Sequence, residues 1–328
     1  MAQLPVRARP AVLLLLLLFW LPGGTSQPGI DLPGLLSLSA PESVAGDSPD
    51  ATDFGALSRA QLARAAALHR QLRPADQARL DGLLDTLPGA ARGYLLKALA
   101  AGHSLAELTG LARAMAGKDG YWLRTHLSPI DPYEPGLAHY RGYLVKQYDG
   151  TTCGSTAIVL AHLLTDPLFA LQLTGENPGD DTGERFLARL KAEERRVHGA
   201  TNLVWPMLLG TPPWGIRDQM NLPGVGVGGR YEWTMVPDWA PRAADAVLRQ
   251  ALVAVGRGYP VPVLIGDLIP RHYVLLVAVT TGGALFFEPG SGAILRIPPD
   301  DLIRRDFHAL GFGTLKGAVL PIGAIRHT

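Results

Sequence analysis

A single cysteine, Cys153, lies where a polar, glycine-containing loop gives way to a long apolar run. The run over residues 157–164 predicts a largely buried helix, and Thr151 or Thr152 is placed to cap its start. A thiol there lies at the positive end of the helix dipole, beside backbone N–H groups that lack intrahelical partners, and this favours the thiolate. A lone cysteine forms no internal disulfide and no zinc site of the usual Cys/His spacing.

A second polar residue, Gln147, precedes the cysteine by six positions. Its side-chain amide is a neutral donor of the kind that stabilises an oxyanion formed close to a nucleophilic sulfur. The alternative is that Cys153 is an ordinary small buried residue at a helix start, since free cysteine is among the most buried residue types.

A histidine and an acid flank a predicted hairpin further along the chain. Residues 261–267 and 272–279 are aliphatic and rich in β-branched side chains, which predicts adjacent buried strands. His272 opens the second strand, and a third strand over residues 284–288 ends at Glu288. Hairpin pairing brings the start of one strand beside the end of the next, so we expect His272 and Glu288 to be neighbours. The alternative for His272 is a strand-end histidine bonded to backbone.

The combination suits nucleophilic catalysis. A histidine near the sulfur takes its proton and later protonates the leaving group, while a third residue fixes the orientation of the imidazole. Gln147, Cys153, His272 and Glu288 follow one another in that functional order along the chain.

Gln-x5-Cys-Gly-Ser at the start of a buried helix resembles the nucleophile region of papain-like cysteine peptidases, and the downstream order is closer to the bacterial C39-like peptidases. The resemblance covers about residues 140–321. It implies an α+β, papain-like fold with the nucleophile helix packed on an antiparallel sheet. It also implies that Cys153 is the nucleophile, His272 the base and Gln147 the oxyanion donor, with no cofactor and no metal. The chain departs from the family at Glu288, because that position is usually Asp or Asn.

The N-terminal residues predict an exported protein. Arg7 and Arg9 precede an apolar run over residues 11–21 and small residues up to Ser26, which is typical of a secretory signal peptide spanning residues 1–26. The alternative is an uncleaved N-terminal anchor. We expect a secreted or extracytoplasmic location. The formal net charge of +1 gives no electrostatic case for nucleic-acid or membrane-surface binding.

The remaining chain divides into three predicted parts. Residues 27–53, rich in Pro, Gly, Ser and Asp, indicate a disordered linker, residues 54–118 a helical region, and residues 119–328 the catalytic domain. In the helical region, Ser104 and Glu107 form a capping box, and His103 is expected to be solvated or a cap residue. The region is a small domain, a pro-segment that covers a cleft, or part of the catalytic domain.

Three further segments have defined expectations. Residues 121–143, rich in aromatic residues and proline, predict an irregular entry into the catalytic domain. Residues 182–198 predict a charged amphipathic helix whose charges, Glu194 included, form a solvated face. The glycine run at residues 224–229 is expected to be a flexible lid or cleft wall, because it lacks the strand, helix and Gly-Lys-Ser/Thr of a phosphate loop.

These observations predict an exported cysteine peptidase or amidase that hydrolyses a peptide or protein substrate through a Cys-His-Glu triad. Two alternatives stay open. One is a non-enzymatic exported peptide- or glycan-binding protein on a papain-like scaffold, and the other is an acyl-transferring enzyme similar to transglutaminases. The enzyme hypothesis requires the Cys153 sulfur, the His272 imidazole and Gln147 to lie together, whereas the binding hypothesis does not.

Overall fold

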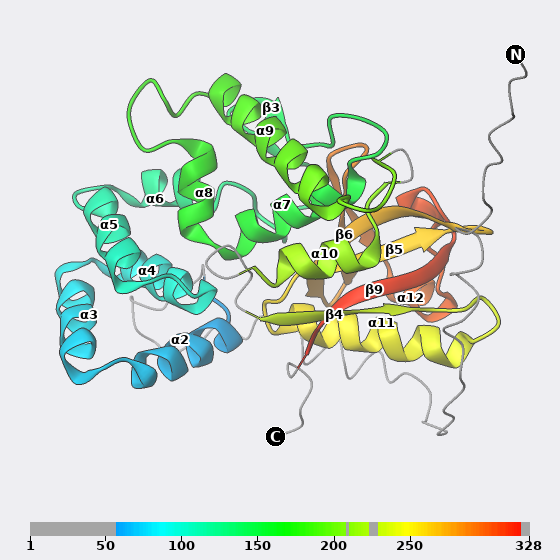
Figure 1. Cartoon of the computed structure of the whole chain (residues 1–328), viewed down its shortest axis with the longest axis horizontal. Helices are drawn as coiled ribbons and strands as arrows, with labels where there is room; N and C mark the ends of the chain where they lie inside the picture. Colours follow the sequence, from blue (N-terminus) through cyan, green and yellow to red (C-terminus); the bar gives the residue numbers. More distant parts are fainter. Residues whose placement is uncertain (1–56, 208–209, 223–228, 323–328) are drawn as a thin grey trace, which may run out of the picture.

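The protein is α+β in a computed structural model that describes residues 57–207, 210–222 and 229–322. The predicted signal peptide, the predicted linker and most of the glycine run at 224–229 lie outside the described residues. Figure 1 shows a helical part on the left and a sheet covered by helices on the right.

The larger sheet has seven strands in the order β1-β8-β7-β6-β5-β9-β4, and each neighbouring pair is antiparallel. The strands span Gly136–Leu137 (β1), Arg230–Met235 (β4), Val261–Gly266 (β5), Pro270–Thr280 (β6), Gly283–Glu288 (β7), Ala293–Ile297 (β8) and Thr314–Ile322 (β9). A small second sheet pairs β2 (His139–Tyr140) with β3 (Tyr143–Leu144).

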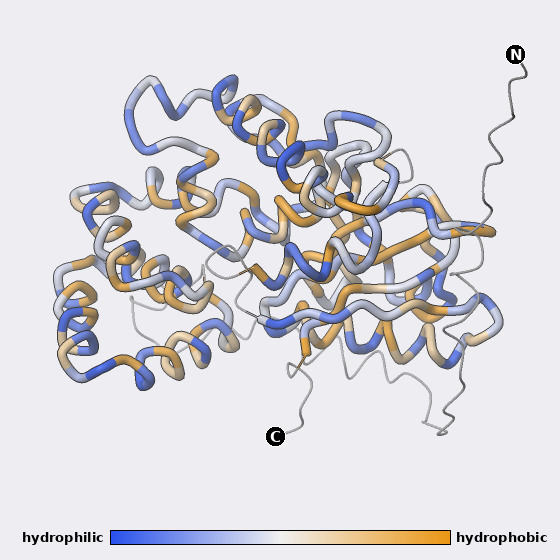
Figure 2. The backbone as a smooth tube through the Cα atoms, in the orientation of Figure 1, coloured by the Kyte–Doolittle hydropathy of each residue, from blue (hydrophilic) through white to orange (hydrophobic). Residues whose placement is uncertain are grey.

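Helices cover both faces of the large sheet (Figure 1). Successive side chains of a strand point to opposite faces, so the aliphatic strands β5, β6 and β7 supply two cores. Tyr273 and Leu275 pack with helix α7 (Cys153–Thr165), whereas Val274 and Leu276 pack with helix α11 (Pro241–Gly256). In Figure 2 the hydrophobic colour follows the central strands and α7, while the connection between α8 and α9 is hydrophilic.

The described residues of this part also form helices α8 (Pro167–Thr174), α9 (Gly183–Thr201), α10 (Pro213–Met220) and α12 (Pro299–Arg304), with a 3₁₀ turn at His308–Leu310. The predicted helix over residues 182–198 is confirmed as α9, with Thr182 accepting a hydrogen bond from the Arg185 N–H at its start. Its expected solvated face is wrong at Glu194, which is fully buried.

The helical part has its own apolar core. Its helices are α2 (Arg59–Gln71), α3 (Pro74–Thr86), α4 (Gly89–Ala101), α5 (Leu105–Met115) and α6 (Gly120–Leu127). The predicted capping box is confirmed, since Ser104 and Glu107 bond each other's backbone N–H at the start of α5.

The prediction of an irregular segment from residue 121 is wrong over α6. Asp119 accepts a hydrogen bond from the Trp122 N–H at 2.7 Å and so starts a helix. Leu123 and Leu127 of this helix are buried in the core of the helical part, which therefore continues to Leu127.

The helical part docks on α8 and on the end of α11. His103 Nε2 lies 2.7 Å from Asp166 Oδ2 at the α7–α8 junction, and Ser58 Oγ donates to the Arg257 carbonyl at 3.0 Å. The expectation of a solvated His103 is wrong, because its side chain is 3% exposed and pairs with a carboxylate that is 0% exposed.

Among the described residues no single helix is long and apolar enough to cross a membrane, and α7 with α8 passes that test only as a pair bent by 112°.

Candidate active site

Helix α7 begins at the cysteine itself. The sequence predicts the apolar run from residue 157, but the helix starts at Cys153 and takes in Gly154, Ser155 and Thr156. Thr152 occupies the N-cap position without a side-chain capping bond. Its hydroxyl donates instead to the Asp149 carbonyl at 3.2 Å, so the predicted N-cap position is confirmed at Thr152 but the capping hydrogen bond is absent. The backbone N–H groups of the first turn have no intrahelical acceptor, so the positive end of the helix dipole lies beside the Cys153 thiol.

His272 and Glu288 are neighbours, as predicted. The His272 Nε2 atom lies 2.7 Å from Glu288 Oε1, across the β6–β7 hairpin. The backbone N–H groups of Gly290 and Ser291 each donate to the same carboxylate at 2.7 Å. The longer Glu side chain thus folds back on its own loop and still reaches the imidazole.

The electrostatics of the pair favour an imidazolium and a carboxylate. Burial opposes the charge on His272, but hydrogen bonding and charge interactions with Cys153 and Glu288 outweigh it and raise its pKa to about 9. Burial likewise opposes the charge on Glu288, yet hydrogen bonds from His272, Ser291 and Gly290 lower its pKa to about 2. Because Nε2 is engaged by Glu288, Nδ1 is the ring nitrogen left for the sulfur.

Gln147 lies beside both halves of the site. Its backbone N–H donates to the Pro289 carbonyl at 2.9 Å, which ties it to the loop that follows Glu288. Its side-chain Nε2 donates to the Asp149 carbonyl at 2.7 Å in the loop before Cys153, and its Oε1 is buried without a partner among the described residues. The structure thus brings Gln147 to the nucleophile loop, with one amide hydrogen committed to Asp149.

Two aromatic residues at this site were not predicted from the sequence. The ring of Phe312 lies 5.9 Å from the His272 ring, between centroids, and shields it. The Tyr273 hydroxyl is buried without a partner among the described residues, and burial, with the charge of Cys153 adding to it, raises its pKa. Strand alternation around His272 points to Tyr273 as an α7-facing residue, whereas no signal marks Phe312.

The connection between α9 and α10 covers the start of α7. Asn202 Nδ2 donates to the Gly210 carbonyl at 2.7 Å, and Thr211 lies directly against Gly154. With this cover the Cys153 residue is 5% exposed. The same connection carries Leu203 and Val204, which are 85% and 88% exposed.

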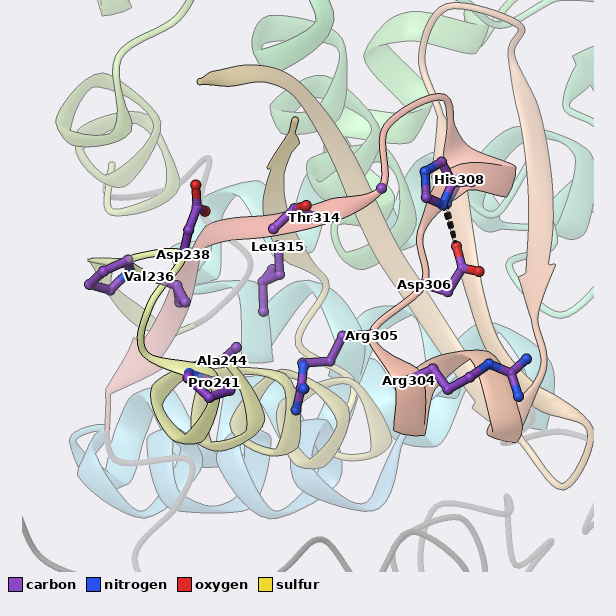
Figure 3. A pocket seen from close by; sticks show the side chains of 12 residues that line it. Val236, Asp238, Pro241, Ala244, Arg304, Arg305, Asp306, His308, Thr314 and Leu315 are labelled. Atoms are coloured by element: carbon purple, nitrogen blue, oxygen red, sulfur yellow. Dashed lines mark hydrogen bonds and ion pairs between the residues drawn. The ribbon is translucent and has the colours of Figure 1, made fainter. Parts of the chain in front are cut away.

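No group of three His, Cys, Asp or Glu side chains among the described residues is arranged to hold a metal ion. A cavity of about 420 Å³ lies elsewhere, between α11 and the start of β9. In Figure 3, Arg305 extends towards Pro241 and Ala244 of α11, while His308 pairs with Asp306 at 2.7 Å. This cavity is on the α11 side of the sheet, whereas Cys153 belongs to the core on the α7 side.

No family model, curated protein or solved structure matches this chain.

Proposed function

We propose that the protein is a cysteine peptidase or amidase of papain-like architecture, closest to the C39-like peptidases, that acts through Cys153, His272 and Glu288. The observation that carries the proposal is the 2.7 Å distance between His272 Nε2 and Glu288 Oε1. Burial lowers the pKa of His272, but its interactions with the Cys153 sulfur and with Glu288 outweigh burial and raise it. A strand-end histidine bonded only to backbone would have neither partner.

The reaction follows from the charges. The Cys153 thiolate attacks an amide carbonyl carbon, and the oxyanion that forms faces the Cys153 backbone N–H and Gln147. The imidazolium of His272 gives its proton to the departing amine, which leaves an acyl thioester. Water, deprotonated by neutral His272, then releases the acid and the thiol.

Glu288 holds the imidazole throughout this cycle. Its carboxylate is fixed by two backbone N–H groups before it meets the histidine, so the orientation of the ring does not depend on a mobile side chain. A peptide or protein substrate fits this chemistry, and export is proposed from the signal-like residues 1–26.

The test is the rate of iodoacetamide alkylation against pH, in wild type and in His272→Ala. The measured rate is that of Cys153, because the chain has one cysteine. We expect alkylation near neutral pH to be faster in wild type than in the variant, because the His272 imidazolium stabilises the thiolate that reacts. Equal alkylation rates in wild type and His272→Ala across the pH range would contradict the proposal and favour a binding protein.

A further inference from the structure

A buried carboxylic acid stands behind the nucleophile helix. Glu194 belongs to α9 and has no exposed surface, and its Oε1 lies 2.8 Å from the Thr156 Oγ1 atom of α7. Its Oε2 has no hydrogen-bond partner among the described residues. The charged and polar groups that act on it are Thr156, Lys191, Asp149 and Arg195. His198, one turn further along α9, faces Ser155 instead at 3.4 Å.

The number of available hydrogens indicates which residue donates in the bond between Glu194 and Thr156. The Thr156 hydroxyl also lies 2.9 Å from the Thr152 carbonyl oxygen, and it has only one hydrogen to donate. If that hydrogen goes to the Thr152 carbonyl, then Glu194 must be the donor and must carry a proton. Burial, only partly opposed by the Thr156 bond, raises the pKa of Glu194 to about 7, in keeping with a protonated acid.

The receiving carbonyl belongs to the peptide that presents the oxyanion donor. Thr152 C=O and Cys153 N–H are the two ends of one planar trans peptide and point in opposite directions. The Thr152 carbonyl accepts hydrogen bonds from the Thr156 N–H at 2.9 Å and from the Thr156 hydroxyl. Because the peptide is planar, the hydrogen bonds that Thr156 makes to the Thr152 carbonyl also fix the direction of the Cys153 N–H, which points towards the site.

We propose that Glu194, in its protonated form, is a positioning residue that acts through Thr156 and the Thr152–Cys153 peptide to hold the Cys153 N–H on the reacting carbonyl oxygen. When Glu194 loses its proton, the carboxylate takes the Thr156 hydrogen for itself and the Thr152 carbonyl loses one of its two donors. The inference rests on the proposed function, and it assigns a use to a residue of α9 whose charge predicts a place on the solvated face.

Two reactions of the same thiol separate the oxyanion donor from thiolate activation. Iodoacetamide alkylation displaces iodide from carbon, forms an S–C bond and develops no oxyanion. Acylation by p-nitrophenyl acetate passes through an oxyanion, forms an S–C bond and expels p-nitrophenolate, whose absorbance gives the rate. The ratio of the two rate constants, acylation over alkylation, therefore reports the oxyanion donor alone.

The variants are Glu194→Leu, Glu194→Gln and Thr156→Val, with Glu193→Leu as the matched control one residue away on α9, where Glu193 pairs with Arg196. We expect Glu194→Leu and Thr156→Val to lower the ratio about 10-fold, less than the 10²–10³ typical of losing an oxyanion donor outright. Glu194→Gln donates to Thr156 through its amide and should restore the ratio. Thermal unfolding verifies that each variant is folded, and Thr156→Val carries the test if Glu194→Leu does not fold.

The pH dependence of the acylation-to-alkylation ratio is a further measurement, which a purely structural role of Glu194 would leave unchanged. In wild type we expect the ratio to fall as pH rises through about 7, the pKa of Glu194, and in Glu194→Gln we expect it to stay flat. An activated thiol with an unchanged ratio in both Glu194→Leu and Thr156→Val, or an equal pH slope in wild type and Glu194→Gln, would overturn this inference alone. Equal alkylation of wild type and His272→Ala would instead overturn the proposed function.

Discussion

At the scale of single residues, Glu288 and His272 make the stability of the fold depend on pH. The pKa of Glu288 in the fold is about 2, against an ordinary 4.5, so its contribution to stability is present above pH 4.5 and is lost as pH falls through about 2. The pKa of His272 is about 9, against an ordinary 6.5, so its contribution is present below pH 6.5 and is lost as pH rises through about 9. The two windows overlap between pH 4.5 and 6.5.

Replacing Glu288 by Gln should therefore destabilise the protein most between pH 4.5 and 6.5 and progressively less towards either end of the scale. The free energy of unfolding from urea denaturation, measured for wild type and Glu288→Gln over this range, checks the prediction. The control is Asp306→Asn, because Asp306 also pairs with a histidine but on the surface, at His308. A difference between wild type and Glu288→Gln that does not vary with pH would exclude the ion pair.

The sequence predicts the pairing of His272 with Glu288 but not the contact between Glu194 and Thr156. The hairpin pattern was enough to bring His272 beside Glu288, because strand pairing depends on local alternation. The charge of Glu194 predicts exposure, whereas its spacing along α9 predicts burial, and the structure follows the spacing. Phe186, Leu190 and Val197 are buried on α9, and Glu194 falls on the same face at four- and three-residue steps. That spacing was readable, whereas the partner hydroxyl of Thr156 comes from another helix and was not.

At the scale of elements, the start of α7 depends on close packing with the α9–α10 connection. Glycine, serine and threonine are weak helix formers, which is why propensity placed the helix start later than Cys153. Tertiary packing overrides propensity here. A Cβ atom built on Gly154 would lie 2.6 Å from the Thr211 Cβ, so the two segments approach as closely as a hydrogen side chain allows.

Gly154→Ala should lower the free energy of unfolding by about 1–3 kcal/mol, because the overpacking outweighs the better helix propensity of alanine. It should also slow Cys153 alkylation, since the helix start shifts. Gly110→Ala is the matched control, as Gly110 lies within α5 with no atom within 4 Å of an added Cβ. That control should gain about 0.5–1 kcal/mol. Equal changes in the two variants would contradict the packing argument.

Across the whole molecule, the helical part docks at the far end of the nucleophile helix. Its buried contact joins His103 to Asp166, which follows the last residue of α7. With a rise of 1.5 Å per residue, the twelve steps from Cys153 to Thr165 place this contact about 18 Å along the helix from the thiol. Apolar spacing, Pro and Gly breaks and the capping box predict the helices but not their docking site, because His103 and Asp166 are 63 residues apart in the chain.

His103→Ala should lower the free energy of unfolding by about 3 kcal/mol, because it removes the histidine partner of the buried Asp166 carboxylate. His69→Ala is the matched control, since His69 also pairs with an aspartate, Asp81, at 2.8 Å but with 56% of that carboxylate side chain exposed. Its change should stay below about 1 kcal/mol. Urea denaturation of both variants measures the difference, and equal losses would contradict the buried contact.

The alkylation rate of Cys153 in His103→Ala then decides the role of the helical part. We expect it to equal the wild-type rate, whereas faster alkylation would identify that part as a pro-segment covering the thiol.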